Sequence, residues 1–283
     1  MSASERMSIL CPNCRQLISR DEAKCPYCGI RSPGSRWKGI AFEGGFLNED
    51  TLIRTIIVTN AILFAASVLI SAASHGAAMN PLGFLSPSPD ALFMLGATGT
   101  VPIGRFHRWW TLISASYLHG GILHILFNMA ALNQIGPLVL REFGFCRWII
   151  IYTVGGALGF FLSYLMRVSF TIGASASVCA LIGAALYYGK SRSGFYGEAI
   201  FKQLMGWVTG IFIFGLLVPG VNNWGHGGGI IGGVVLGYLL GYRERRAETY
   251  YQKMGALACI VLTVVILMWA LISALFYRLT FMH

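Results

Sequence analysis

The sequence predicts an all-α membrane protein, a polytopic helical bundle that follows a small module with four cysteines. Two observations predict this class. Of the 283 residues, 55% are hydrophobic and only 11% are charged, whereas an ordinary soluble domain is about a quarter charged. The hydrophobic residues also gather in long runs, and all 11 acidic residues lie outside those runs. Lipid is therefore the main solvent of this chain.

The chain divides into three segments by composition. Residues 1–34 are polar, rich in proline and glycine, and contain the four clustered cysteines, and residues 35–51 form a linker. Residues 52–283 hold every long apolar run and form the expected transmembrane domain. Its three cysteines lie singly in or beside the apolar runs, where we expect them to be small packing residues.

The four clustered cysteines form two Cys-x-x-Cys pairs separated by ten residues, Cys11 with Cys14 and Cys25 with Cys28. Each pair can direct two thiolates toward one point, and four thiolates complete the tetrahedral shell of a structural Zn²⁺. We therefore expect a zinc-ribbon-like module. Iron in a rubredoxin-like site would use the same ligands. Two disulfides or free thiols are the remaining alternative, which a reducing cytoplasm disfavours.

Seven apolar runs predict seven membrane-spanning helices. A helix needs about 20 apolar residues to cross the hydrocarbon core, so the first and last runs are long enough by themselves. Four of the five runs between them are shorter, and the five together contain His, Asn, Ser and many Gly residues, which is typical of helices packed inside a bundle. The runs cover residues 52–73, 117–138, 148–166, 175–189, 203–218, 226–242 and 255–277.

A connection of about 43 residues, 74–116, separates the first two runs. It contains four prolines and an aromatic cluster at Phe106, His107, Trp109 and Trp110. Aromatic side chains of this kind favour the interface between lipid and water. Long connections in compact domains are more often functional than incidental, so we expect a functional loop that lies partly in the headgroup layer.

The distribution of positive charge predicts the orientation of the helices. With a cytoplasmic amino terminus, 17 of the 21 Lys and Arg residues fall in cytoplasmic segments, as the positive-inside rule requires. The carboxyl terminus is then outside, and the second, fourth and sixth runs begin on the outer side. Because the positive residues are scattered between apolar runs, the net charge of +10 does not indicate a nucleic-acid partner. We expect a plasma (inner) membrane location, since no organelle-targeting segment is visible.

Polar side chains gather at the outer ends of the second and fourth runs. His124 and Asn128 are four residues apart, so they share one face of a helix, shortly after His119. Such residues are often only interhelical hydrogen-bonding partners. Ser175 begins the fourth run, where free backbone amides and the helix dipole would stabilise an oxyanion. A serine at this position can also be a simple helix cap.

His226 opens the sixth run and is followed by a stripe of glycines. The glycines recur every four residues, at positions 225, 229, 233, 237 and 241. The fourth run has small residues at the same interval, Ser175, Cys179 and Gly183. Small residues at this spacing let two helix backbones approach closely. We therefore expect the His226 imidazole to reach the Ser175 hydroxyl.

The other known intramembrane protease chemistries lack their residues here. Aspartyl proteases need two buried acids, metalloproteases need His-Glu-x-x-His, and a Ser–Lys dyad needs a buried lysine. All five lysines and all 11 acids lie outside the apolar runs, which also excludes a full Ser–His–Asp triad. A serine hydroxyl with a histidine base remains, a pair that needs no catalytic cofactor.

These three groups resemble the signatures of the rhomboid intramembrane proteases, in the order of that family. The signatures are the run from His119 to Asn128, the Gly-x-Ser at Gly173 to Ser175, and His226 with its glycines. The resemblance covers about residues 52–277 and implies a six-helix rhomboid-like core with a seventh, carboxyl-terminal span. It also identifies the 74–116 connection with the interfacial loop of the family.

The resemblance implies a role for each polar residue. Ser175 would be the nucleophile and His226 the general base. His124 and Asn128, with the Ser175 backbone amide, would form the oxyanion hole, and His119 would support their loop. The implied function is an intramembrane serine endopeptidase that cleaves transmembrane protein substrates near the outer membrane face.

Three positions depart from the family pattern. Ala176 stands where a glycine usually follows the serine, and Cys179 replaces an aromatic residue that could stack on the base. The usual Trp-Arg of the first loop reads Trp109-Trp110-Thr111, with Arg108 displaced. These differences affect the expected oxyanion geometry more than the dyad itself.

Two other functions would fit parts of the sequence. A catalytically inactive rhomboid-like protein that binds membrane clients would usually lack the serine or the histidine, and both are present. A transporter or channel would need a polar path through the whole bilayer, whereas the ionisable residues here cluster at one depth. The zinc-ribbon-like module could recruit a cytoplasmic partner, sense metal or cap the amino terminus, and the sequence favours none of the three.

Overall fold

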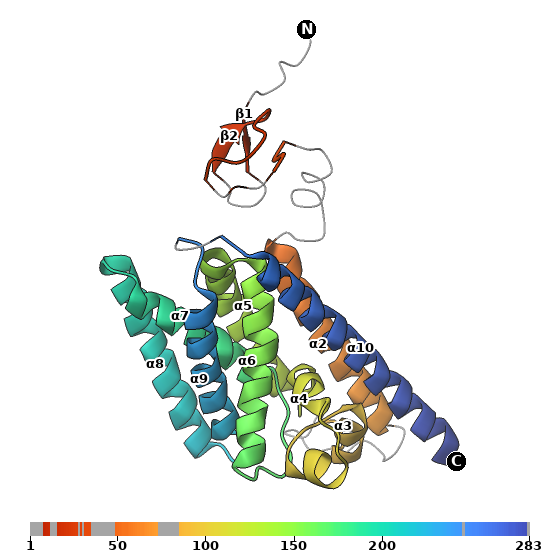
Figure 1. Cartoon of the computed structure of the whole chain (residues 1–283). Helices are drawn as coiled ribbons and strands as arrows, with labels where there is room; N and C mark the ends of the chain where they lie inside the picture. Colours follow the sequence, from red (N-terminus) through yellow and green to blue (C-terminus); the bar gives the residue numbers. More distant parts are fainter. Residues whose placement is uncertain are drawn as a thin grey trace.

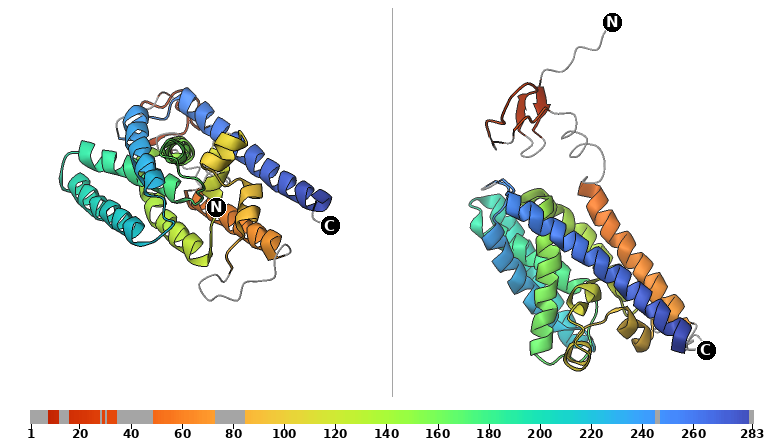
Figure 2. Two further views of the ribbon diagram at one scale, coloured as in Figure 1. Left: turned by 90° about the horizontal axis from the view of Figure 1, so that it is seen from below. Right: turned by 45° about the vertical axis from the view of Figure 1, so that its right-hand side comes forward.

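A computed structural model describes residues 8–11, 16–27, 29, 31–34, 49–72, 85–244 and 247–281 of the chain (Figure 1). Within these residues a bundle of seven long helices forms the larger part, and α8 and α10 stand on opposite sides of it (Figure 2). The long helices are α2 (Glu49–Ala72), α5 (Ile122–Phe143), α6 (Phe145–Leu165), α7 (Ser175–Ser191), α8 (Phe195–Leu217), α9 (Asn223–Leu240) and α10 (Tyr250–Phe281).

Five of these helices, α2, α5, α6, α8 and α10, are long and apolar enough to cross a membrane. Length and composition thus fit a multi-pass membrane protein, as predicted. The other two, α7 with 17 residues and α9 with 18, coincide with the predicted fourth and sixth runs. They contain the Ser, His and Gly residues that lower hydropathy, and they pack closely on α6 and on each other. In α7, 13 of the 17 residues are buried.

Three helices differ from the predicted runs by five residues or more at one end or both, and the third of them, the seventh helix, begins at Tyr250 instead of residue 255. The second helix begins at Ile122 instead of residue 117, since residues 115–117 form a separate 3-10 turn and Gly120 and Gly121 follow it. The fifth begins at Phe195 instead of residue 203. Its first turns carry Glu198 and Lys202, an ion pair one turn apart (2.7 Å). A run of high hydropathy indicates only the part of a helix that lies in lipid. It therefore misses a polar extension of the same helix.

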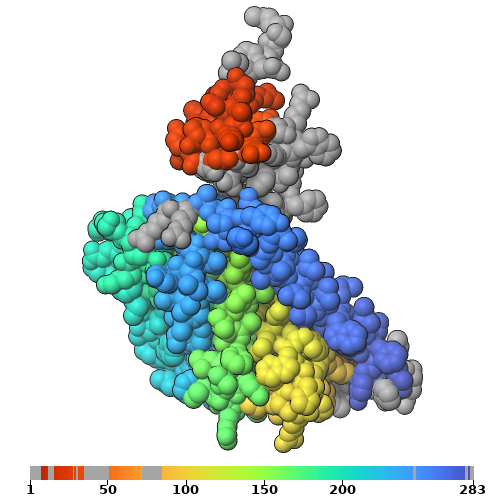
Figure 3. Space-filling view, viewed as in Figure 1, coloured from red at the N-terminus to blue at the C-terminus, as the bar shows by residue number. Residues whose placement is uncertain are grey.

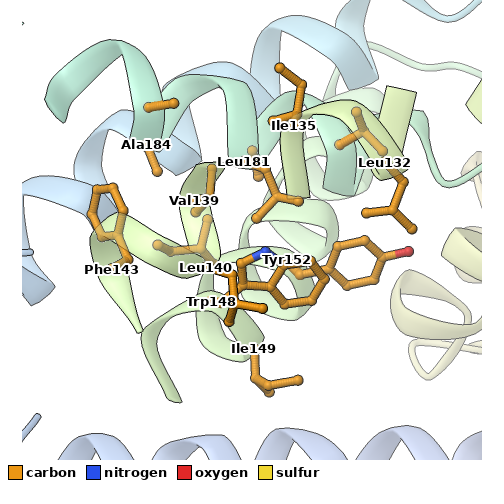
Figure 4. Packing of buried hydrophobic residues seen from close by; sticks show 14 of the residues in the cluster. Leu132, Ile135, Val139, Leu140, Phe143, Trp148, Ile149, Tyr152, Leu181 and Ala184 are labelled. Atoms are coloured by element: carbon orange, nitrogen blue, oxygen red, sulfur yellow. The ribbon is translucent and has the colours of Figure 1, made fainter. Parts of the chain in front are cut away.

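The core of the domain lies where α5, α6 and α7 meet (Figure 4). Trp148 stacks on Tyr152 with ring centroids 5.1 Å apart, and its indole N–H donates to the Gly136 carbonyl (3.0 Å). Leu132 and Leu181 fill the adjacent space with no more than a trace of exposure. Inside a membrane, close packing and interhelical hydrogen bonds of this kind replace the hydrophobic effect as the cause of helix association.

The predicted glycine contact between the fourth and sixth spans is present. A β-carbon at Gly229 would collide with the Ala176 carbonyl, and one at Gly233 would collide with the Ala180 carbonyl. From the other side, a β-carbon at Gly183 would collide with the Ile230 carbonyl. The α7 and α9 backbones are therefore in direct contact along their length. The sequence did not predict that α6 joins this contact, through Gly159, whose β-carbon would stand 2.6 Å from the Gly225 carbonyl.

The connection before the second span is ordered into short helices from residue 85 onward, although the sequence predicted no regular structure there. They are α3 (Pro89–Leu95), a π-helical turn η1 (Val101–Arg105), α4 (Thr111–Ser114) and the 3-10 turn η2 (Ala115–Tyr117). The α3 and α4 helices pack against α10, and α4 also packs against α6 (Figure 3). Phe106 and Trp109 are about half exposed, which agrees with the expected interfacial position of this loop.

Arg108 anchors this loop. Its guanidinium donates to the carbonyls of Phe93 (2.6 Å) and Met94 (3.1 Å) at the end of α3. It also lies 4.6 Å from the ring centroids of both Phe93 and Trp110. Burial lowers the pKa of Arg108, but a guanidinium stays charged at any physiological pH. The displaced arginine thus has a structural role of its own.

The amino-terminal module contains a short antiparallel hairpin, β1 (Ser8–Leu10) and β2 (Leu17–Ser19). Cys11, Ile18 and Cys25 are buried together in its small core. Cys14 and Cys28 lie outside the described residues, as does most of the predicted linker, and α2 begins at Glu49. Among the residues that are described, no three potential ligands gather around one point. The predicted Zn²⁺ site therefore stays a prediction.

Candidate active site

Ser175 is the first residue of α7 and is half-buried. The chain reaches it through Gly173, which has a left-handed φ of +124° and whose N–H donates to the Ala115 carbonyl (2.9 Å). A β-carbon at Gly173 would stand 2.7 Å from the Nε2 atom of His124. Both the φ angle and the close approach therefore require glycine here. The result is a serine hydroxyl at a helix amino terminus with free backbone amides around it.

His226 lies in the first turn of α9 and is 8% exposed. Three residues further on, Gly229 packs on the Ala176 carbonyl. A β-carbon added to Gly229 would lie 3.1 Å from the Cys179 β-carbon. Because Ala176 directly follows Ser175, α9 meets α7 one residue from the serine. No hydrogen bond joins Ser175 to His226 in the described part of the chain, and the His226 Nδ1 atom has no partner there. Such pairs are often looser before substrate binds.

His124 has a defined hydrogen-bonding state. Its Nδ1 atom accepts the Gly120 N–H (3.3 Å), so the neutral imidazole carries its proton on Nε2. Nε2 lies beside Gly173, and the Ser175 Oγ atom is 3.6 Å from the same Gly173 β-carbon position. A donor N–H of His124 therefore faces the space next to the Ser175 hydroxyl.

Asn128 and His119 both contact His124. The Asn128 amide donates to the His124 carbonyl (2.8 Å), one helical turn away as the spacing predicted. His119 is fully buried and packs edge-to-face on the His124 ring, with ring centroids 5.1 Å apart. Neither nitrogen of His119 has a hydrogen-bond partner among the described residues. The contact of His119 with His124 is thus one of ring packing, which agrees with a supporting position.

Backbone pairing brings the loops around the site together. Residues 98–101 of the first loop pair with residues 168–171 before α7, through four N–H to carbonyl bonds of 2.8–3.1 Å. The Ser177 hydroxyl donates to the Ser116 hydroxyl (3.1 Å), which joins α7 to the segment before His119. The two loops therefore hold the His119–Asn128 segment next to Ser175.

Sequence reasoning missed two residues near this site. Ser116 gives no signal, because a lone serine in a loop has no pattern. Asn222 precedes the glycine-rich helix, and its side chain accepts the Gly225 N–H (3.0 Å). The strong preference of asparagine for helix amino termini could have identified it.

The fold and site define a multi-pass helical membrane protein in which a serine and three histidines meet at one end of closely packed helices. Residues 107–243 match the family model described as the Rhomboid domain. These residues contain all three motifs, and α2 and α10 lie outside the match.

Relatives in other organisms agree with this match. RHOMBOID-like protein 1 of Arabidopsis thaliana is 32% identical over 200 residues, which cover 63% of this chain and 50% of that protein. The rhomboid protease GluP of Bacillus subtilis is 31% identical, over 52% of this chain and 29% of GluP. The chain thus spans half or less of the length of these relatives. Residues 107–243 are thus similar to the Rhomboid domain, and the chain is similar to rhomboid-like proteins over about half of its length.

Proposed function

We propose that this protein is an intramembrane serine endopeptidase that cleaves transmembrane proteins near the outer membrane face. The observation that carries the proposal is the direct backbone contact between α7 and α9, which holds Ser175 and His226 on adjoining helix ends. Two relatives support the activity at the level of the family. One is named the rhomboid protease GluP, and another is named Rhomboid-like protease 5, from Toxoplasma gondii.

In the proposed reaction the Ser175 Oγ atom attacks the scissile carbonyl carbon, and the His226 imidazole accepts the hydroxyl proton. The imidazolium then gives this proton to the leaving amine as the peptide bond breaks. Water attacks the resulting acyl-enzyme with the same histidine as base, which releases the carboxylic acid and restores the serine hydroxyl. No acid assists the histidine, so its orientation depends on the packing of α9.

The oxyanion of the tetrahedral intermediate needs hydrogen-bond donors beside Ser175. The Nε2–H of His124 faces this space, and the amide N–H of Ser175 belongs to the first turn of α7, where amides have no partner within the helix. Asn128 would be the third donor after rotation away from the His124 carbonyl. Removal of one such donor typically costs about 10²–10³ in rate.

The site constrains the substrate. Carbonyls in a transmembrane helix are bonded within that helix, so a substrate must unwind locally before Ser175 can attack. Water must also reach the acyl-enzyme, which suits a site at the end of the helices. We propose a cytoplasmic amino terminus and a plasma membrane location, because they place this end of α7 and α9 at the outer face.

The alternative is a catalytically inactive rhomboid-like protein that binds membrane clients. The missing hydrogen bond between Ser175 and His226 would favour it. The retention of both residues, with the helix contact that adjoins them, favours the protease.

Cleavage of a model transmembrane substrate by the full chain in liposomes tests the proposal. We expect Ser175→Ala and His226→Ala each to reduce cleavage at least about 10³-fold and to abolish labelling of Ser175 by a fluorophosphonate probe. Ser67→Ala is the matched control, since Ser67 is buried in α2 and bonds only to its own helix (2.7 Å to the Phe64 carbonyl). Undiminished cleavage by the Ser175 and His226 variants would show that the proposal is wrong.

For the amino-terminal module we propose one structural Zn²⁺ held by Cys11, Cys14, Cys25 and Cys28. The described part of the module buries only two cysteines, Ile18 and Pro33. A core this small does not normally hold a fold without a metal or disulfides. Cys11 and Cys25 are both buried in that core, as two ligands of one metal would be, and the metal would hold the two knuckles together.

A further inference from the structure

Asn222 uses its whole side-chain amide to join three parts of the domain. Its Oδ1 atom accepts the Gly225 N–H (3.0 Å) and caps α9. Its Nδ2 group donates to the Ser163 hydroxyl on α6 (2.8 Å) and to the Thr171 hydroxyl in the loop before α7 (2.9 Å). Ser163 is fully buried and Thr171 is 6% exposed, so water has little access to replace these bonds.

The Thr171 end of this connection leads directly to Ser175. Thr171 exchanges two backbone hydrogen bonds with Thr98 (2.8 and 3.0 Å), and Gly173 bonds to the Ala115 carbonyl. The loop is thus held at residues 171 and 173, and only Ala174 separates the second point from the serine. Because the loop has so little slack, a shift of Thr171 relative to α9 must move Ser175.

The other end of the connection leads to His226. The Asn222 carbonyl accepts the His226 N–H (3.1 Å), so Asn222 begins the helical turn that ends at the histidine. One residue therefore contacts both the loop that carries Ser175 and the turn that carries His226. The glycine contacts set how closely α7 and α9 approach, but they do not join α9 to the loop that precedes Ser175.

We infer that Asn222 is a positioning residue that sets the separation of Ser175 and His226, through the Thr171 hydroxyl. The inference rests on the proposed protease function. A helix cap alone would need only the Oδ1 acceptor, which serine or aspartate also provides. A helix cap does not need the two donor bonds, to α6 and to the loop that contains Thr171. A positioning role requires them.

Conservative variants separate positioning from capping. Asn222→Ser keeps an acceptor for the cap but removes the amide group that donates to Ser163 and Thr171, and Thr171→Val removes the hydroxyl at nearly the same volume. We expect each to lower kcat and the rate of fluorophosphonate labelling about ten- to hundredfold, because catalysis is steeply sensitive to displacements near 1 Å. KM and the melting temperature should change little. Thr171→Ser should restore the rate to near the wild-type value, since it restores the hydroxyl.

The double variant Asn222→Ser with Thr171→Val should be no slower than Asn222→Ser alone, because Asn222→Ser already removes the bond to the Thr171 hydroxyl. Thr59→Val is the matched control, since the Thr59 hydroxyl bonds within α2 (2.8 Å to the Thr55 carbonyl). A wild-type labelling rate for Thr171→Val would overturn the inference, as would additive losses in the double variant or losses that only follow the fraction of folded protein.

The two proposals fail in distinguishable ways. If the positioning role is wrong, the Asn222 and Thr171 variants stay active while Ser175→Ala is inactive. If the protease function is wrong, Ser175→Ala itself leaves cleavage and labelling unchanged.

Discussion

Gly229→Ala is the substitution that most directly tests whether backbone contact between α7 and α9 positions the proposed pair of Ser175 and His226. The added methyl group would overlap the Ala176 carbonyl oxygen and stand 3.1 Å from the Cys179 β-carbon. An ordinary contact needs at least 3.4 Å, and both obstacles belong to the rigid turn that follows Ser175. The helices must therefore part by about 1 Å at the level of the dyad.

The structure supports estimates for both stability and activity. Overpacking by one methyl group in a close-packed interior typically costs about 1–3 kcal/mol. This loss is partly offset by roughly 1 kcal/mol, because alanine favours the helix over glycine. Activity should suffer more, since a displacement of about 1 Å at a catalytic pair commonly reduces the rate about 10²-fold. We thus expect a modest fall in melting temperature and about a hundredfold fall in labelling rate.

Gly227→Ala on the same helix is the control. Its β-carbon would meet only the tip of the Phe212 ring, at 3.5 Å, which is ordinary contact. Both variants, in the full chain and in liposomes, are compared for melting temperature and for fluorophosphonate labelling of Ser175. If Gly229→Ala labels as fast as Gly227→Ala, the helix contact does not position the dyad and the reasoning is refuted.

Three further predictions concern other parts of the chain. The purified protein should contain one Zn²⁺ per chain by elemental analysis. Cys25→Ser should lose this Zn²⁺, and the control Cys146→Ser should keep it. Wild-type protein without metal would contradict the proposed zinc site. Arg108→Ala should destabilise the domain by about 1–3 kcal/mol, as expected for lost hydrogen bonds from a half-buried charged group, and should speed proteolysis within residues 85–117. An unchanged cleavage pattern would show that the anchor is unimportant. Gly173→Ala and Gly194→Ala both place alanine at a positive φ, but only the first meets a side chain of the site. The labelling rate should fall at least about 10²-fold for Gly173→Ala but not for Gly194→Ala. Equal losses in the two variants would show that backbone strain causes the effect.

Much of the fold could be predicted because its signals are local. A long apolar run needs no tertiary partner to indicate a helix in a membrane, and all seven runs coincide with helices. The glycine period in residues 225–241 indicated a close helix contact, which the structure contains at Gly229 and Gly233. The errors occurred where the local composition does not indicate the structure. These places are the polar start of α8 and the ordered helices of the first loop.

The sequence by itself indicated a helical membrane protein and the residues with reactive side chains. It also indicated that two helices have small residues along one face, which allows their backbones to come into contact. Only the tertiary structure decided which nitrogen of His124 bears the proton, what Arg108 binds, and how Asn222 joins the Ser175 loop to the His226 turn. The physical reason is the range of the interactions. Hydropathy and residue size act on the nearest neighbours along the chain, whereas the hydrogen bond between Asn222 and Thr171 joins residues 51 positions apart and depends on how the whole segment between them folds.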